Sequence, residues 1–255
     1  NKMSTTIYQG CTTAYTDTDR ILQCVSEGLQ EENEVLNSAI GIFFLLYASA
    51  LVFFMQAGFA MLCAGSVRQK NVQNTMLKNV LDACTGAISF WAVGFAFAYG
   101  GSINLSDDDD KSVTFIGSEN FFMEGLDDFE IIFWLFQFAF AATSATIVAG
   151  TLAERCQMVG YMLYSVTLTG FIYPVVVHAI WSRRGFLSPS AEDPLFDIGM
   201  LDFAGSGVVH VTGGIASLLA SIILGPRKGR FFDERTGMPL DEPKEILGHS
   251  ASLQV

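Results

Sequence analysis

The stretch Phe203-Ala204-Gly205-Ser206-Gly207-Val208-Val209-His210-Val211-Thr212-Gly213-Gly214 places one histidine among glycines and apolar residues. In the wider segment 201–225, the only other ionisable residue is Asp202. A helix that crosses a membrane needs about 20 mostly apolar residues to span about 30 Å of hydrocarbon. The segment meets that requirement, so the sequence predicts a spanning helix with His210 a few ångströms from its centre.

Four further segments have the same apolar character, and they are 39–65, 75–100, 129–153 and 158–181. The whole chain is 51% hydrophobic and only 16% charged, whereas soluble domains carry about a quarter charged residues. We therefore expect an all-α polytopic membrane protein with five transmembrane helices and the start of a sixth at 248–255. Residues 1–38 are expected to form an N-terminal tail, and residues 39–255 the membrane domain.

The charged residues indicate an orientation and exclude one class of partner. A net charge of -12 argues against nucleic-acid binding, because that requires clustered Lys and Arg. With Asn1 outside, nine of the 14 Lys and Arg residues fall on the inner segments, so the positive-inside rule predicts an outer N-terminus. The outer run Asp107-Asp108-Asp109-Asp110 forms either an acidic vestibule or a solvated loop, and Asn104 begins a glycosylation sequon beside it.

Cysteine and nucleophile patterns indicate no metal, cofactor or enzyme site. Cys11 and Cys24 lie in the outer tail, where they could pair within one chain or between chains. No Cys or His spacing resembles a zinc site, so no metal or cofactor is expected. The elbow motif Gly-x-Ser-x-Gly fails around Ser206, because Ala204 occupies its first glycine position. We therefore do not expect an enzyme, and no catalytic residue is assigned.

Two ionisable residues of the fifth span are candidate functional residues, because burying such groups in a membrane is costly. His210 suits a narrow passage, since glycines lie beside it, but a structural hydrogen bond to another helix fits equally well. The ladder Gly213, Ser217, Ser221 suits close helix packing. Asp202 is first of all a candidate helix cap, and a cation site is the alternative.

Aromatic residues of the third and fourth spans form a second group of candidates. Phe136 and Phe140 are four residues apart, so we expect their rings to stack along one helix face. Ordinary packing explains such a pair, and a gate that blocks hydrated ions is the alternative. Trp181, one turn after His178, is either a membrane-interface residue or an aromatic face for a cation.

A series of strings, in order along the chain, carries a resemblance to a known family. They include Phe59-Ala60-Met61-Leu62-Cys63-Ala64-Gly65-Ser66-Val67-Arg68, Lys78-Asn79-Val80-Leu81-Asp82, Leu152-Ala153-Glu154-Arg155, Gly170-Phe171-Ile172-Tyr173-Pro174-Val175-Val176, Asp202 through Gly214, Gly225-Pro226-Arg227-Lys228-Gly229-Arg230-Phe231 and Gly248-His249-Ser250-Ala251-Ser252-Leu253. Together they resemble the ammonium transporter (Amt/Mep/Rh) family, nearest its plant-type eukaryotic Amt branch.

The resemblance implies an eleven-helix fold of two inverted five-helix repeats, assembled as a homotrimer with one pore in each subunit. It implies transport of ammonium, with methylammonium as an analogue, across the plasma membrane of a eukaryote. Trp181 resembles the outer recruitment aromatic, Phe136 and Phe140 the paired gate, and His210 the first of two pore histidines. Asp202 resembles the acid near the outer mouth.

The chain looks like the first half of such a transporter, because five spans supply only one repeat. The second pore histidine would lie in the later half, so we expect that this chain does not conduct alone. Two alternatives stay open. One is an ammonium sensor or signalling receptor, and the other is a non-conducting subunit that joins trimers.

Overall fold

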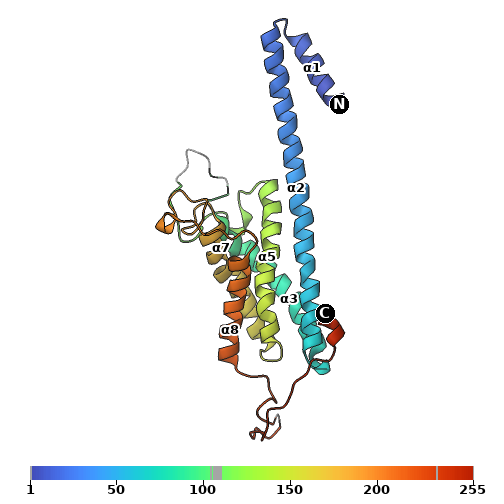
Figure 1. Cartoon of the computed structure of the whole chain (residues 1–255), viewed down its shortest axis with the longest axis vertical. Helices are drawn as coiled ribbons and strands as arrows, with labels where there is room; N and C mark the ends of the chain where they lie inside the picture. Colours follow the sequence, from blue (N-terminus) through green and yellow to red (C-terminus); the bar gives the residue numbers. More distant parts are fainter. Residues whose placement is uncertain (1, 104, 106–110, 234, 255) are drawn as a thin grey trace. The chain divides into compact units, whose positions relative to one another are not determined.

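The computed structural model describes residues 2–103, 105, 111–233 and 235–254 (Figure 1). In these residues helices dominate and no strand is formed; two isolated bridges pair Thr114 with Gly185 and Phe232 with Pro239. The expectation of an all-α fold is confirmed. Asn104 and the Asp107–Asp110 run lie outside the described residues.

Residues 1–47 form one compact unit. It contains α1 (Lys2–Ala14) and the first part of α2 (Thr18–Ser66). The segment expected as a tail is thus largely helical, since Leu, Gln and Glu favour helix over much of its length. A disulfide joins Cys11 to Cys24 with the two Cα atoms 5.9 Å apart. Of the two pairings that the sequence allows, this structure contains the one within the chain.

Residues 48–255 form the second unit, which holds the remainder of α2 and the other helices. Among the described residues, its other α-helices are α3 (Val72–Ser89), α4 (Phe95–Tyr99), α5 (Asp128–Leu152), α6 (Met158–Thr167), α7 (Tyr173–Trp181) and α8 (Thr212–Leu224). The described residues of this unit also form three π-helical turns, η2 (Phe90–Gly94), η4 (Leu168–Ile172) and η6 (Ser206–Val211). They form four short 3-10 turns, η1 (Gln69–Asn71), η3 (Phe121–Met123), η5 (Leu195–Asp197) and η7 (Ala251–Leu253).

Five helical segments of the described residues are long and apolar enough to cross a membrane. They are Thr18–Ser66, Gln69–Tyr99, Asp128–Leu152, Met158–Trp181 and Ser206–Leu224. The expected five spans are confirmed, although the fifth begins at Ser206 rather than near residue 201. A sixth span was expected to start at 248–255; in the described residues 248–254 the only helical element is the short turn η7, and the backbone N–H of His249 donates to the Val67 carbonyl oxygen (3.1 Å).

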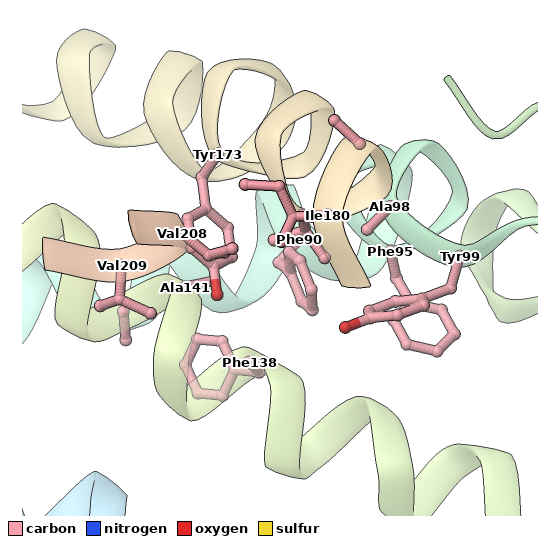
Figure 2. Close-up of a cluster of buried hydrophobic side chains, with 13 residues drawn as sticks. Phe90, Phe95, Ala98, Tyr99, Phe138, Ala141, Tyr173, Ile180, Val208 and Val209 are labelled. Carbon is pink, nitrogen blue, oxygen red and sulfur yellow. The ribbon is translucent and has the colours of Figure 1, made fainter. Parts of the chain in front are cut away.

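In the second unit, α5 is the central helix. It packs against α8 and against α3 (Figure 1). Helix α4 packs against α7. The buried core between them includes Phe90, Phe138, Tyr173 and Val208, which come from four different segments and face one another in Figure 2. The second, third, fourth and fifth spans therefore each contribute apolar side chains to a common core.

Candidate functional site

An aromatic row runs from the end of α7 onto α5. Trp181 is the last residue of α7, and its ring meets Phe140 edge to face, with centroids 5.9 Å apart. Phe140 in turn meets Phe136 at 5.0 Å and an interplanar angle of 83°. The predicted stacking of this pair is wrong in its geometry, because the rings meet edge to face. That arrangement places the positive edge of one ring against the negative face of the other.

Trp181 is fixed to the start of the fifth span by a hydrogen bond and by close packing. Its indole Nε1–H donates to the Asp202 carbonyl oxygen (2.7 Å). A Cβ atom added to Gly205 would lie 3.5 Å from the Trp181 ring and only 2.7 Å from Val209. Gly205 also has φ of +85°, a conformation that other residues adopt at a cost. A glycine at this position therefore allows the span to begin directly beside the indole.

The buried carboxylate of Asp202 binds the first turn of that span. Its Oδ1 accepts from the N–H groups of Gly205 (2.8 Å) and Ser206 (2.9 Å), and its Oδ2 accepts from Gly207 (2.9 Å) and Val208 (2.7 Å). Burial raises the pKa of Asp202, but these backbone hydrogen bonds outweigh it and hold the pKa below the ordinary value. The interpretation of Asp202 as a helix cap is confirmed, and its part in a substrate pathway stays a prediction.

His210 bonds within its own span rather than to another helix. Its Nδ1 lies 3.1 Å from the Gly205 carbonyl oxygen. Because a carbonyl oxygen only accepts, Nδ1 must carry the proton, and the neutral ring then offers Nε2 as an acceptor. The expected alternative of a hydrogen bond across helices is not formed in the described part of the chain. The residue as a whole is exposed.

Gly213 and Gly214, which follow His210, lie on different sides of α8, one packed and one open. Gly213 lies against α5, because an added Cβ would come within 3.0 Å of Ile147 and of the Ser144 carbonyl oxygen. Ser217 continues this contact by donating from Oγ to the Ile147 carbonyl oxygen (3.5 Å). An added Cβ on Gly214 would meet nothing within 4 Å in the described structure. The close-packing interpretation therefore holds for the Gly213 side.

Sequence reasoning assigned no role to His178, which is fully buried. Its Nδ1–H donates to the Ala98 carbonyl oxygen (2.8 Å), and its Nε2 lies 2.8 Å from Thr114 Oγ1. The ring therefore ties the loop around Thr114 to α4 and α7 near Trp181. A polar residue inside an apolar run was the available signal, but its partners are too distant in sequence to be predicted.

At the opposite end of the bundle, Glu154 joins three helix ends. Its Oε1 accepts from Arg68 Nε (3.0 Å) and Asn71 Nδ2 (2.5 Å), and its Oε2 accepts from Arg227 Nη1 (3.3 Å). Burial raises the pKa of Glu154, but the hydrogen bonds from Asn71 and Arg68 and the charge of Arg68 hold it below the ordinary value. In the described residues, no three or more His, Cys, Asp or Glu side chains cluster as metal ligands would.

Comparisons with known proteins agree on one group. A sequence profile described as the Ammonium Transporter Family matches residues 43–253. Ammonium transporter 1 member 3 of Solanum lycopersicum is 46% identical over 222 residues, which are 86% of this chain and 45% of that protein. Putative ammonium transporter 1 of Caenorhabditis elegans is 44% identical over 83% of this chain and 37% of its own length. This chain thus spans less than half of these curated relatives.

Solved structures show the same likeness. A protein titled "Sensor Amt Protein" superposes with a TM-score of 0.71 at 29% identity, over 87% of this chain and 51% of that one. Candida albicans Mep2 gives a TM-score of 0.63 at 26% identity, over 84% of this chain and 44% of its own.

Proposed function

Because this chain belongs to the ammonium transporter family, we propose that it forms one wall of a membrane path for ammonium and ammonia. Its family and its named relatives are transporters and not enzymes. The observation that carries the proposal is the continuous arrangement of Trp181, Phe140 and Phe136 beside the span that holds His210.

The chemistry of these residues suits the passage of ammonium nitrogen. The face of Trp181 attracts a small cation and compensates part of its lost hydration. The rings of Phe140 and Phe136 oppose a hydrated ion, because a bare charge in an apolar constriction is costly, and so favour loss of the proton. Neutral ammonia beyond them can donate an N–H to His210 Nε2, which the Gly205 hydrogen bond leaves as an acceptor.

The setting of the site is part of the same proposal. The domain occupies residues 39–255 in a plasma membrane, with the N-terminus outside, as the distribution of Lys and Arg favours. The bilayer covers apolar side chains such as Ile222 and Ile223, which are 69% and 81% exposed in the single chain. The complete pore is a homotrimer subunit in which a second histidine faces His210.

A sensor that binds ammonium is the second candidate function. It is favoured by the likeness to a solved protein whose title calls it a sensor. The outer aromatic site would serve either function, because both require recognition of the cation. Flux separates them, since a pure sensor shows saturable binding without transport.

The proposed function is tested by methylammonium uptake in transport-deficient cells that express the complete reading frame. We expect Trp181→Leu to raise KM, because the cation–π face is lost, and His210→Ala to lower kcat by about tenfold or more. Trp91→Leu is the matched control, because Trp91 is 43% exposed and contacts Phe122 rather than the aromatic row. Wild-type uptake by both site variants would refute the site assignment.

A further inference from the structure

Three arginines line a pocket of about 410 Å³ at the end of the bundle opposite Trp181. Arg155 follows α5, whereas Arg227 and Arg230 follow α8. Ser66, the last residue of α2, lies in the same wall, so the ends of three spans meet at the pocket. In the described part of the chain no acidic side chain lines it. The proposed function assigns no role to any of these residues.

Only part of the positive charge around this pocket is balanced. Arg227 shares the Glu154 carboxylate with Arg68, so one negative charge faces two positive charges. Neither Arg155 nor Arg230 has an ion pair among the described residues. Burial lowers the pKa of Arg155, and the charges of Arg227 and Arg230 lower it further. The three guanidinium groups therefore repel one another, and an anion between them would relieve that repulsion.

The arginines are placed so that a ligand can reach them. Arg155 Nη1 donates to the Gly225 carbonyl oxygen (3.2 Å), which holds this guanidinium against the end of α8. Arg230 is exposed, and its Cζ lies 5.5 Å from the centroid of the Phe231 ring. A guanidinium presents its N–H groups as a planar fork that matches two oxygens of a phosphate group. An open pocket with such donors suits a phosphate group.

The remaining walls are apolar, which favours a lipid as the source of the phosphate. Pro226, Phe231 and Ile246 line the pocket beside the arginines. The last turn of α8 lies directly before them in sequence, and its Ile222 and Ile223 are 69% and 81% exposed. Acyl chains attached to a bound phosphate can cover such apolar surface, whereas a free phosphate ion makes no use of it. Basic pockets at the ends of spanning helices bind lipid head groups for this reason.

We propose that the pocket of Arg155, Arg227 and Arg230, called the arginine pocket below, binds the phosphate group of an anionic membrane lipid. Arg155 and Arg230 donate N–H groups to the phosphate oxygens, and the acyl chains lie along the apolar last turn of α8. A free phosphate ion is the other source of the same chemistry. The site is separate from the aromatic row, so the proposal goes beyond transport and does not depend on it.

Arg155 also lines a second pocket, of about 380 Å³, which suits a phosphate less well. Lys78 lies in its wall, but the Lys78 ammonium donates to the Cys156 carbonyl oxygen (2.6 Å). The Glu154 carboxylate is in the wall too, and it would repel an anion. The arginine pocket has no such carboxylate among its described lining residues.

The test is equilibrium binding of dioctanoyl phosphatidic acid to the purified protein, expressed from its complete reading frame and kept in a neutral detergent. Arg230→Gln is the decisive variant, because no hydrogen bond or ion pair engages the Arg230 guanidinium in the described structure. We expect its Kd to rise about tenfold, the loss typical of one charge-assisted hydrogen bond, with an unchanged Tm. Arg155→Gln should raise Kd to a similar extent.

Arg235→Gln is the matched control, because Arg235 lies in the same segment after α8, is exposed and does not line the pocket. We expect its Kd to equal that of the wild type. Binding by Arg230→Gln within about twofold of wild type would overturn the inference, and so would an equal loss in Arg235→Gln.

Two further ligands identify the source of the phosphate. Inorganic phosphate carries the same phosphate chemistry as phosphatidic acid without acyl chains, and dioctanoyl phosphatidylcholine carries the chains with a choline group that offsets the phosphate charge. We expect both to bind the wild type at least about tenfold more weakly than phosphatidic acid. Equal affinity for inorganic phosphate would overturn the lipid source and assign the pocket to the free ion. Equal affinity for phosphatidylcholine would overturn recognition of the phosphate charge.

Discussion

At the scale of single residues, Asp202 decides where the fifth span begins. Four backbone N–H groups converge on its two oxygens, and its own carbonyl oxygen holds the Trp181 indole. One residue thus joins the aromatic row to the segment that carries His210. Loss of the side-chain charge should therefore affect both the stability of the helix start and the position of the indole.

We predict that Asp202→Asn destabilises the protein by about 2 kcal/mol or more, because an amide NH₂ would face N–H donors that now bond a carboxylate. The measurement is the midpoint of thermal unfolding in detergent, with the exposed Asp193→Asn as control. The pKa of Asp202 lies below its ordinary 3.8, so its stabilising effect is complete above that value and is lost as pH falls through the lowered pKa. Equal midpoints for the two variants at neutral pH would contradict the prediction.

The sequence alone predicts part of this residue chemistry. The position of Asp202 before an apolar run indicates a cap, and the spacing of Phe136 and Phe140 indicates a ring pair. The number of donors at Asp202 depends on the positive φ of Gly205. Tertiary structure sets that conformation, so no local pattern reveals it.

At the scale of elements, α8 has one side built for contact and one that is open. Gly213 lets α8 approach the backbone of α5, since the Ser144 carbonyl oxygen would lie 3.0 Å from an added Cβ. Gly214, the next residue, has open space at the equivalent position. The pair offers a comparison in which the same substitution meets two different environments.

We predict that Gly213→Ala destabilises the 255-residue chain, whereas Gly214→Ala stabilises it slightly. The first forces α5 and α8 apart at a tight contact and should cost about 1–3 kcal/mol. The second gains up to about 1 kcal/mol of helix propensity without a clash. Thermal unfolding of both variants in detergent measures the difference, and a loss of stability in Gly214→Ala equal to that in Gly213→Ala would contradict it.

The sequence predicts where the membrane spans lie better than it predicts the hydrogen-bonding pattern inside them. The apolar runs locate the five spans because burial in lipid requires them. The π-helical turns η2, η4 and η6 were not predicted, because they differ from α-helix only in which carbonyl group accepts each N–H. The helices of residues 2–38 were not predicted either. We expected helices from apolar runs, and the charged residues of this segment lower its hydropathy.

At the scale of the whole membrane unit, residues 48–255, Glu154 connects segments that are distant in sequence. Arg68 follows α2, Glu154 follows α5 and Arg227 follows α8. The two arginines both form ion pairs with the Glu154 carboxylate. Arg227 also donates to the Ser66 carbonyl oxygen (3.3 Å), which belongs to the last turn of α2. The cluster therefore fixes the spacing of three spans at the end opposite Trp181. The string around Glu154 is one of those that carry the family resemblance. It does not indicate which residues pair with the Glu154 carboxylate.

We predict that Glu154→Gln lowers the thermal unfolding midpoint at about pH 7, because two arginines lose their counter-ion. The cost should be about 2 kcal/mol, below the range for fully buried pairs, since solvent reaches both guanidinium groups.

The folded-state pKa of Glu154 lies below the ordinary 4.5, so the unfolded state binds more protons near that pH. The wild-type advantage is therefore complete above 4.5 and disappears as pH falls through the lowered pKa. Glutamine does not titrate, so the gap between the two midpoints should shrink as pH falls below 4.5 and through the lowered pKa. Glu242→Gln, at an exposed position, should leave the midpoint unchanged at every pH tested. A gap between wild type and Glu154→Gln that persists undiminished at low pH would show that the carboxylate charge does not hold the three spans together.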